Sequence, residues 1–219
     1  MPLPIHSARH CGATSINNKC LNMPTRRLAL KGLGTLGLVS GAGLGFPAWA
    51  HNSAGLVSPP QAPPPVRLLL HDGRQTTLRE LLTGRVTAVQ LMFVGCTATC
   101  PIQGALFASA EQLLGHRTGK PPLMQLVSLS IDPLNDDAKA LKGWRQRFGA
   151  GESWVAGSPV MKDVDPWLDF LQGRNKGVDR HTAQVYFFNP RAELAFRTVD
   201  FPPAPEIVKL LKALSVQPT

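Results

Sequence analysis

The chain has 219 residues, which is typical of one domain with short appendages, and 43% of them are apolar. Its formal net charge of +9 is unevenly distributed, because residues 1–50 carry five basic side chains and no acidic one. The remaining residues hold 18 basic and 14 acidic groups, with no basic run interleaved with aromatics, which argues against nucleic-acid binding.

The N-terminal segment has the features of an export signal. Arg26 and Arg27 precede a glycine-rich, weakly apolar stretch at residues 32–46, and a small-x-small cleavage pattern follows at residues 47–50. This order is typical of a twin-arginine signal, so we expect residues 1–50 to be an N-terminal extension and leader of a periplasmic protein. The alternative is a retained membrane anchor, because residues 32–50 hold no charge, although six glycines and a proline weaken such a span.

Export would remove two of the four cysteines. Cys11 and Cys20 lie before the expected cleavage site, which leaves Cys96 and Cys100 in an oxidising compartment where disulfides persist. A bridge between residues so close in sequence constrains little chain entropy, so it would stabilise the fold poorly. We therefore expect this pair to serve a reaction or a metal rather than stability.

The mature chain is predicted to begin with a proline-rich linker at residues 51–65, with order starting near Val66. Apolar periodicity then predicts strands and helices along the rest of the chain. Strands are predicted at residues 66–70, 86–94, 123–131, 154–155 (a short edge strand), 184–188 and 194–199, the last two joined by a turn at residues 189–192. Helices are predicted at residues 77–82, at 105–114, from a cap at Asp136 or Asp137 to Gly149, at 160–171 with Pro166 marking a join, and at 205–214.

This order of elements predicts an α/β, thioredoxin-like fold for residues 66–219, with a central mixed β-sheet flanked by helices. Sheets with crossover helices tend to carry their reactive groups at the carboxyl ends of strands. The sequence Cys-Thr-Ala-Thr-Cys-Pro, residues 96–101, directly follows the apolar strand predicted at residues 86–94. The cysteine pair is therefore predicted to lie where such a fold places its site.

The cysteine pair allows two kinds of chemistry. If Cys100 lies in the first turn of the following helix, both thiols face the same side, so they can form a disulfide or hold one soft metal ion. Thioredoxin-type redox motifs have two residues between the cysteines, whereas this chain has three. Two buried, inert thiols are the remaining interpretation.

A metal site needs a third ligand, and the mature chain offers four histidines, namely His51, His71, His116 and His181. His181 precedes the strand predicted at residues 184–188. In a thioredoxin-like sheet the loop entering this strand lies beside the cysteine turn, where redox members carry a cis-proline. Residues 178–184 contain no proline here. We therefore take His181 as the candidate ligand, with an ordinary surface histidine as the alternative.

Three motifs give the chain a resemblance to the SCO/SenC family of exported copper proteins, which help to assemble the binuclear copper centre of cytochrome c oxidase. The motifs are the cysteine sequence, Ser-Ile-Asp-Pro at residues 130–133, and His181 before the strand that ends in Phe-Asn-Pro at residues 188–190. The resemblance covers residues 66–214 and implies that Cys96, Cys100 and His181 are copper ligands. Family members often carry an acid between the cysteines and another before the histidine, where this chain has Thr-Ala-Thr and Arg180.

The leading hypothesis is a periplasmic copper metallochaperone rather than an enzyme. Two thiolates and an imidazole suit both Cu(I) and Cu(II), and a three-ligand site suits an ion that is handed on, since structural zinc sites usually have four ligands. The implied partners are a copper acceptor, either a cytochrome c oxidase subunit or another cuproprotein, and a thiol reductant, because only reduced cysteines bind the metal.

The alternative hypothesis is a thiol–disulfide oxidoreductase that reduces the cysteines of a copper-site protein. In that reaction Cys96 would attack and Cys100 would resolve the mixed disulfide. A peroxide-reducing enzyme of the peroxiredoxin type is disfavoured, because the cysteines are paired and no peroxide-activating arginine is recognisable beside them.

Overall fold

An eight-stranded sheet forms the centre of the part of the chain that the structure describes, with the strand order β1-β8-β7-β4-β5-β6-β2-β3. The structure is a computed structural model and describes residues 54–115, 123–176 and 180–216. The strands are β1 (Gly55–Gln61), β2 (Arg67–Leu70), β3 (Gln75–Thr77), β4 (Val86–Met92), β5 (Met124–Ser130), β6 (Trp154–Pro159), β7 (Val185–Phe188) and β8 (Leu194–Arg197). β4, β5 and β6 run parallel to one another, and the other neighbouring pairs are antiparallel.

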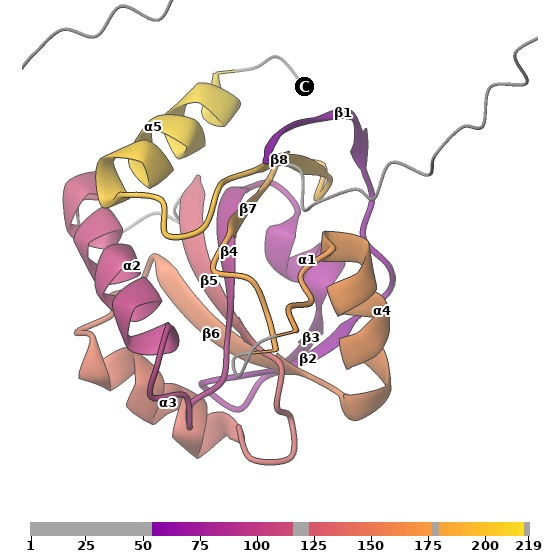
Figure 1. The fold of residues 1–219 in the computed structure, drawn as a ribbon, viewed down its shortest axis with the longest axis vertical. Coiled ribbons are helices and arrows are strands. Elements are labelled where there is room, and N and C mark those ends of the chain that lie inside the picture. Colours follow the sequence, from indigo (N-terminus) through magenta and orange to yellow (C-terminus); the bar gives the residue numbers. More distant parts are fainter. Residues whose placement is uncertain (1–53, 116–122, 177–179, 217–219) are drawn as a thin grey trace, which may run out of the picture. The chain divides into compact units, whose positions relative to one another are not determined.

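Helices cover both faces of this sheet. They are α1 (Leu78–Leu82), α2 (Cys100–Leu114), α3 (Ala138–Arg147), α4 (Met161–Leu171) and α5 (Ala204–Ser215). Figure 1 shows α2, α3 and α5 on one side of the sheet and α1 and α4 on the other, which agrees with the two large apolar clusters. The predicted α/β, thioredoxin-like fold with a mixed sheet is thus confirmed. Within the described ranges, no helix combines the length and apolar character needed to cross a membrane.

The central strand β4 is buried along its whole length, and its residues point alternately to the two faces of the sheet. Val86 and Ala88 pack in the cluster under α2 and α5, whereas Val89 and Leu91 pack in the cluster under α1 and α4. This alternation follows from the two-residue period of a strand. It also determines the face of the sheet on which the last residue of β4 lies. The cysteine motif follows this residue in the sequence.

The proline-rich segment at residues 51–65 departs from its prediction. β1 (Gly55–Gln61) pairs antiparallel with β8 and buries Val57, so the expectation that order begins near Val66 is wrong. β1 is the outermost strand of the sheet, where prolines that cannot donate to a ladder are tolerated. Residues 1–53 lie outside the described part of the chain, so the leader and its boundary at residue 50 stay predictions.

The short edge strand predicted at residues 154–155 is wrong in both length and place. β6 spans Trp154–Pro159 and lies between β5 and β2. Its Ala-Gly-Ser-Pro sequence has the composition of a turn, but close packing requires a glycine at residue 157. A Cβ on Gly157 would lie 3.1 Å from the side chain of Leu70 and 3.3 Å from that of Leu129.

The join predicted at Pro166 is also wrong, because α4 continues through this residue. A proline inside a helix removes one backbone donor and costs stability. The buried side chains of Trp167, Leu168 and Leu171 hold α4 against the sheet in spite of that cost. The other predicted elements are confirmed with shifted ends, and β3 was not predicted.

Candidate metal centre

The cysteine motif lies in a turn that connects β4 directly to α2. The amide of Cys96 donates to the carbonyl of Phe93 at 3.1 Å, and α2 begins at Cys100 rather than at residue 105 as predicted. Pro101 follows within the first helical turn, where its missing N–H removes no helical hydrogen bond. The predicted position of the pair, where a strand ends and a helix begins, is confirmed.

The sulfur of Cys96 takes the place of a side-chain cap on α2. Thr99 is the N-cap residue, but its side chain makes no capping hydrogen bond. The amide of Cys100 instead donates to Sγ of Cys96 at 3.4 Å, and no acidic residue lies in the first turn. A backbone donor and the positive end of the helix dipole therefore face this sulfur, which stabilises negative charge on it. Cys96 is 4% exposed and Cys100 is fully buried.

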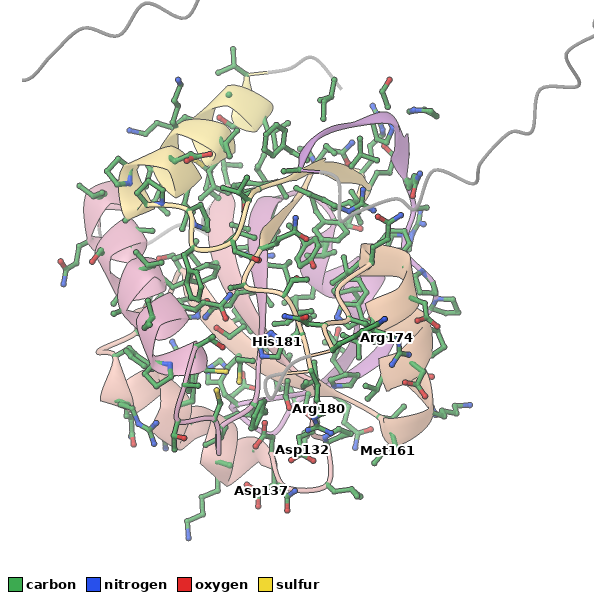
Figure 2. All side chains as sticks on the ribbon, viewed as in Figure 1. Asp132, Asp137, Met161, Arg174, Arg180 and His181 are labelled. Carbon is green, nitrogen blue, oxygen red and sulfur yellow. The ribbon has the colours of Figure 1, made fainter. Side chains whose placement is uncertain are left out.

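His181 reaches this turn from a distant part of the sequence, just before β7. Its Nε2 lies 3.6 Å from Sγ of Cys100, and the residue is only 2% exposed. Figure 2 shows His181 at the end of the sheet, beside the sulfur atoms that gather near α2 and α3. The alternative of an ordinary surface histidine is therefore wrong.

The hydrogen bond at Nδ1 determines which nitrogen of His181 is available to an ion. Nδ1 lies 2.9 Å from the carbonyl oxygen of Thr182, and a carbonyl oxygen can only accept. Nδ1 therefore carries the proton and donates a hydrogen bond to the carbonyl oxygen of Thr182, and in the neutral imidazole Nε2 carries a lone pair. That lone pair is on the side of Cys100, and an N–H bond to a backbone carbonyl is the usual support of a metal-binding histidine.

The spacing of Cys100 and His181 fits two ligands of one ion. With metal–sulfur and metal–nitrogen lengths of about 2.3 Å and about 2.0 Å, tetrahedral ligands stand about 3.5 Å apart. The observed separation of 3.6 Å is close to this value. Within the described residues, no group of three His, Cys, Asp or Glu side chains already has the arrangement of a metal site. Completing a three-ligand site with Cys96 therefore requires a rearrangement of side chains.

The loop that carries His181 is held by backbone and side-chain hydrogen bonds. The amide of Thr182 donates to the carbonyl of Gly173 at 2.9 Å, and its hydroxyl lies 2.7 Å from the hydroxyl of Tyr186 on β7. Burial raises the pKa of Tyr186 to about 12, so this phenol stays protonated at neutral pH. The residue after the histidine is thus fixed on two sides, which restricts where the imidazole can lie.

The ring of Phe93 connects the cysteine turn to the histidine loop. It meets the imidazole of His181 edge-on, with centroids 6.2 Å apart and planes at 90°. The guanidinium of Arg180 lies over the same ring, 5.6 Å from its centroid, and Arg180 has a left-handed φ of 57°. One aromatic side chain therefore holds both the imidazole and the neighbouring cation.

Arg174 ties the histidine loop to α4. It pairs with His181 in an isolated antiparallel bridge, and its guanidinium contacts Asp165 at 2.7 Å and Asp169 at 2.6 Å. The hydrogen bonds that Arg174 donates to these carboxylates, Asp169 first, raise the pKa of Arg174 above its ordinary value. Because the groups are exposed, each ion pair contributes at most about 1 kcal/mol to stability. Its main effect is therefore to orient the Arg174 side chain between the histidine loop and α4.

Of the other candidate histidines, His71 is the one in the described part of the chain, and it hydrogen-bonds to the backbone. His71 follows β2, and its Nδ1 lies 3.2 Å from the carbonyl oxygen of Ala156. Burial, followed by the charge of Arg145, lowers the pKa of His71, which keeps this side chain neutral near pH 7. His51 and His116 lie outside the described residues.

Asp136 has a structural role that its position in the sequence did not predict. Asp137 is the residue that caps α3, by accepting from the amide of Ala140 at 2.8 Å. Asp136 is instead buried, and its Oδ2 accepts from the hydroxyl of Ser130 at 2.6 Å and from the amide of Val94 at 3.0 Å. It therefore ties the end of β5 to the segment that enters the cysteine turn. The Ser-Ile-Asp-Pro motif was the available signal, because it contains one of the two donors.

We expect Asp136→Ala to lower the free energy of unfolding by about 2 kcal/mol, because it leaves buried donors on Ser130 and Val94 without an acceptor. Asp137→Ala is the matched control and should cost about 1 kcal/mol, the value of an N-cap. Burial raises the pKa of Asp136, so protonation of this carboxyl stabilises the folded state. This pH-dependent contribution is greatest below the ordinary value of 3.8 and is lost as the pH rises through the raised value, whereas the two accepted hydrogen bonds persist.

Denaturant unfolding between pH 3 and pH 7 measures both effects. Asp136→Asn keeps an acceptor and cannot ionise. Its free energy of unfolding should therefore rise relative to that of the wild type as the pH increases from 3 to 7. An equal loss of unfolding free energy in Asp136→Ala and Asp137→Ala would contradict the role of Asp136 as the buried acceptor for Ser130 and Val94.

The described part of the chain has the fold of several solved proteins. It is similar to a SCO1/SenC family lipoprotein from Bacillus anthracis, with a TM-score of 0.61, 20% identity, and coverage of 73% of this chain and 99% of that chain. It is similar to BsSco, described as a member of the Sco family of cytochrome c oxidase assembly proteins with a disulfide switch, with a TM-score of 0.61, 20% identity and coverage of 73% and 96%. Yeast Sco1 with copper bound gives a TM-score of 0.59, 16% identity and coverage of 73% and 91%.

These identities are low, so the structural matches establish a shared fold. No protein with a curated description matches the sequence. The sequence profile of the SCO1/SenC family matches residues 58–214, which is most of the chain and contains both cysteines and the histidine. The protein therefore belongs to the SCO1/SenC family.

Proposed function

We propose that this protein binds copper through Cys96, Cys100 and His181 and delivers it to a cuproprotein. The observation that carries the proposal is the 3.6 Å approach of Nε2 of His181 to Sγ of Cys100, with the lone pair of Nε2 on that side. Soft thiolates suit Cu(I), and the imidazole suits Cu(II) as well, so the donor set is appropriate for copper in either state.

The family supports copper delivery in cytochrome c oxidase assembly. Yeast Sco1 is described with copper bound, and BsSco is described as a cytochrome c oxidase assembly protein. The acceptor of this chain is accordingly a copper-site subunit of that oxidase or another cuproprotein. A thiol reductant is the second partner, because the cysteines hold a metal only in their reduced form.

Transfer would proceed by exchange of ligands between the two proteins. The candidate ligands are buried, but the exposed residues Gly95, Thr97 and Ala98 surround Cys96. An acceptor thiolate can therefore approach from this side and replace Cys96 first, while Cys100 and His181 still hold the ion. The final exchange releases copper to the acceptor without passing it through water.

Titration of the reduced protein with copper tests this function. We expect one copper ion per chain in the wild type and no high-affinity binding after Cys96→Ser and Cys100→Ser are combined, because serine supplies no soft donor. Competition with a chromophoric Cu(I) chelator measures the affinity. An unchanged affinity in the double variant would refute the proposed ligands.

Export is part of the same proposal and is supported by the twin arginines, the glycine-rich stretch and the cleavage pattern of residues 26–50. We expect the periplasmic form to begin at His51, and the mass of the purified mature protein measures this. A periplasmic protein that keeps residues 32–50 would favour the retained anchor instead.

Thiol–disulfide exchange is a second candidate function, favoured by the amide of Cys100 that donates to Sγ of Cys96. In this reaction the Cys96 thiolate attacks a partner disulfide, forms a mixed disulfide and releases one partner thiolate. Cys100, as its thiolate, then attacks Sγ of Cys96 and releases the second partner thiolate. Two electrons pass from the cysteine pair to the partner, which leaves Cys96 and Cys100 disulfide-bonded.

A further inference from the structure

Met92, the last residue of β4, lies in the same packed cluster as both cysteines. This cluster of buried residues consists of Met92, Cys96, Cys100, Leu141, Trp144 and Ala156. Met92 is fully buried. The sequence motif begins four residues later, so sequence spacing alone did not single out this methionine.

The geometry of β4 directs the Met92 side chain toward α2. Val86 and Ala88 lie on the α2 and α5 side of the sheet, and residues two apart on a strand share a face. Met92 is in register with them and therefore lies on the face that α2 covers, where Cys100 begins the helix. Its backbone is fixed by the amide of Ile131, which donates to the Met92 carbonyl at 2.9 Å.

We propose that the Met92 thioether is an additional ligand of the bound ion and makes the site selective for Cu(I). This inference rests on the proposed copper function. A thioether is a soft donor, which favours Cu(I), whereas Cu(II) and Zn(II) gain more from nitrogen and oxygen ligands. Met92 is fully buried, so its thioether would bind from the interior of the protein, whereas the residues that flank Cys96 are exposed.

The apolar surroundings favour a neutral donor over a charged one. Leu141, Trp144 and Ala156 complete the cluster, and burying net charge in such an environment is costly. Two thiolates already outweigh the single positive charge of Cu(I). A thioether adds a third soft bond without adding a further negative charge, which a carboxylate or a third thiolate would do.

The test compares Met92→Leu with the wild type, because leucine has a similar volume and no sulfur, and such exchanges are well tolerated in cores. Met124→Leu is the matched control, since Met124 packs against the separate apolar cluster under α5. Cu(I) affinity is measured by competition with a chromophoric chelator, and Zn(II) affinity is measured by the same method. X-ray absorption of the wild-type Cu(I) protein reports the number of sulfur ligands without requiring any variant.

We expect Met92→Leu to weaken Cu(I) binding by about tenfold or more, the range over which loss of a supporting partner affects a metal site. Zn(II) affinity and the Met124→Leu control should stay within about twofold of the wild type. The sulfur shell of the wild type should fit three atoms and that of Met92→Leu two. Copper binding with a two-sulfur shell and an unchanged Cu(I) affinity in Met92→Leu would overturn the role of Met92 and leave the proposed function standing. A wild type that binds no copper would overturn both.

Discussion

His181→Ala is expected to weaken copper binding by about 100-fold or more, while thiol–disulfide exchange at Cys96 and Cys100 stays within about threefold of the wild type. This loss of copper affinity is larger than that expected for a residue that only hydrogen-bonds to a ligand, because the imidazole of His181 would itself be a ligand. Its Nε2 is the nitrogen atom seen near the sulfur of Cys100, at 3.6 Å. The same titration therefore separates a metal carrier, which needs this nitrogen, from a reductase, which needs only the two sulfurs.

Two controls separate coordination from packing in this experiment. His71→Ala removes another histidine, one that contacts the backbone of Ala156, and should leave copper affinity unchanged. His181→Leu restores apolar bulk beside Phe93 without supplying a nitrogen, so it should bind copper as poorly as His181→Ala. A copper affinity in either His181 variant equal to that of the wild type would remove His181 from the site. It would also favour the reductase function.

The cysteine turn could be predicted from sequence because its signals are local. An apolar run interrupted only by Thr87 and Gln90 defines β4, and the cysteine motif with Pro101 marks the start of α2. Selecting His181 needed one further step, the expectation that the loop entering β7 lies beside this turn in a thioredoxin-like sheet. The sulfur–nitrogen distance that supports the candidate site is a tertiary contact between residues 81 positions apart, so spacing alone could not give it.

The errors arise where tertiary contacts override local preferences. The small residues of β6 resemble a turn, yet Gly157 is required by the side chains of Leu70 and Leu129. The prolines of β1 resemble a linker, yet an edge strand tolerates them. Asp136 and Asp137 are equivalent as candidate caps in sequence, and only the positions of Ser130 and Val94 show which one is buried. Local propensity therefore predicted the central strand β4 better than it predicted β1, β6 and the buried contacts of Asp136.

The contact between α2 and α3 gives a second large effect, at Gly104. This glycine lies one turn after Cys100 on the buried face of α2. A Cβ at this position would overlap the ring of Phe148, with Cε1 only 2.8 Å away and other ring atoms closer. Phe148 follows α3 and packs against Trp144, edge-on, and against Trp154, tilted, with centroids 4.7 Å and 6.1 Å apart, so its ring has little freedom to withdraw.

We expect Gly104→Ala to lower the free energy of unfolding by about 2 kcal/mol, although alanine normally stabilises a helix by about 1 kcal/mol relative to glycine. The overlap would push α2 away from α3 and change the distance between Cys100 and His181, so copper affinity should fall as well. Gly143→Ala is the matched control, because Gly143 is an exposed residue of α3 with nothing within 4 Å of its added Cβ. That variant should be about 1 kcal/mol more stable than the wild type and bind copper normally.

Denaturant unfolding and copper titration of the same samples decide between these outcomes. Phe148→Leu should restore part of the stability and copper affinity lost in Gly104→Ala, since the shorter side chain relieves the overlap. Its effect in the wild-type background should be a loss, because the aromatic contacts with Trp144 and Trp154 disappear. This opposite sign in the two backgrounds is the signature of direct coupling between neighbouring residues. A Gly104→Ala protein as stable as Gly143→Ala would show that α2 tolerates the added methyl and that the packing of its first turns does not set the position of Cys100.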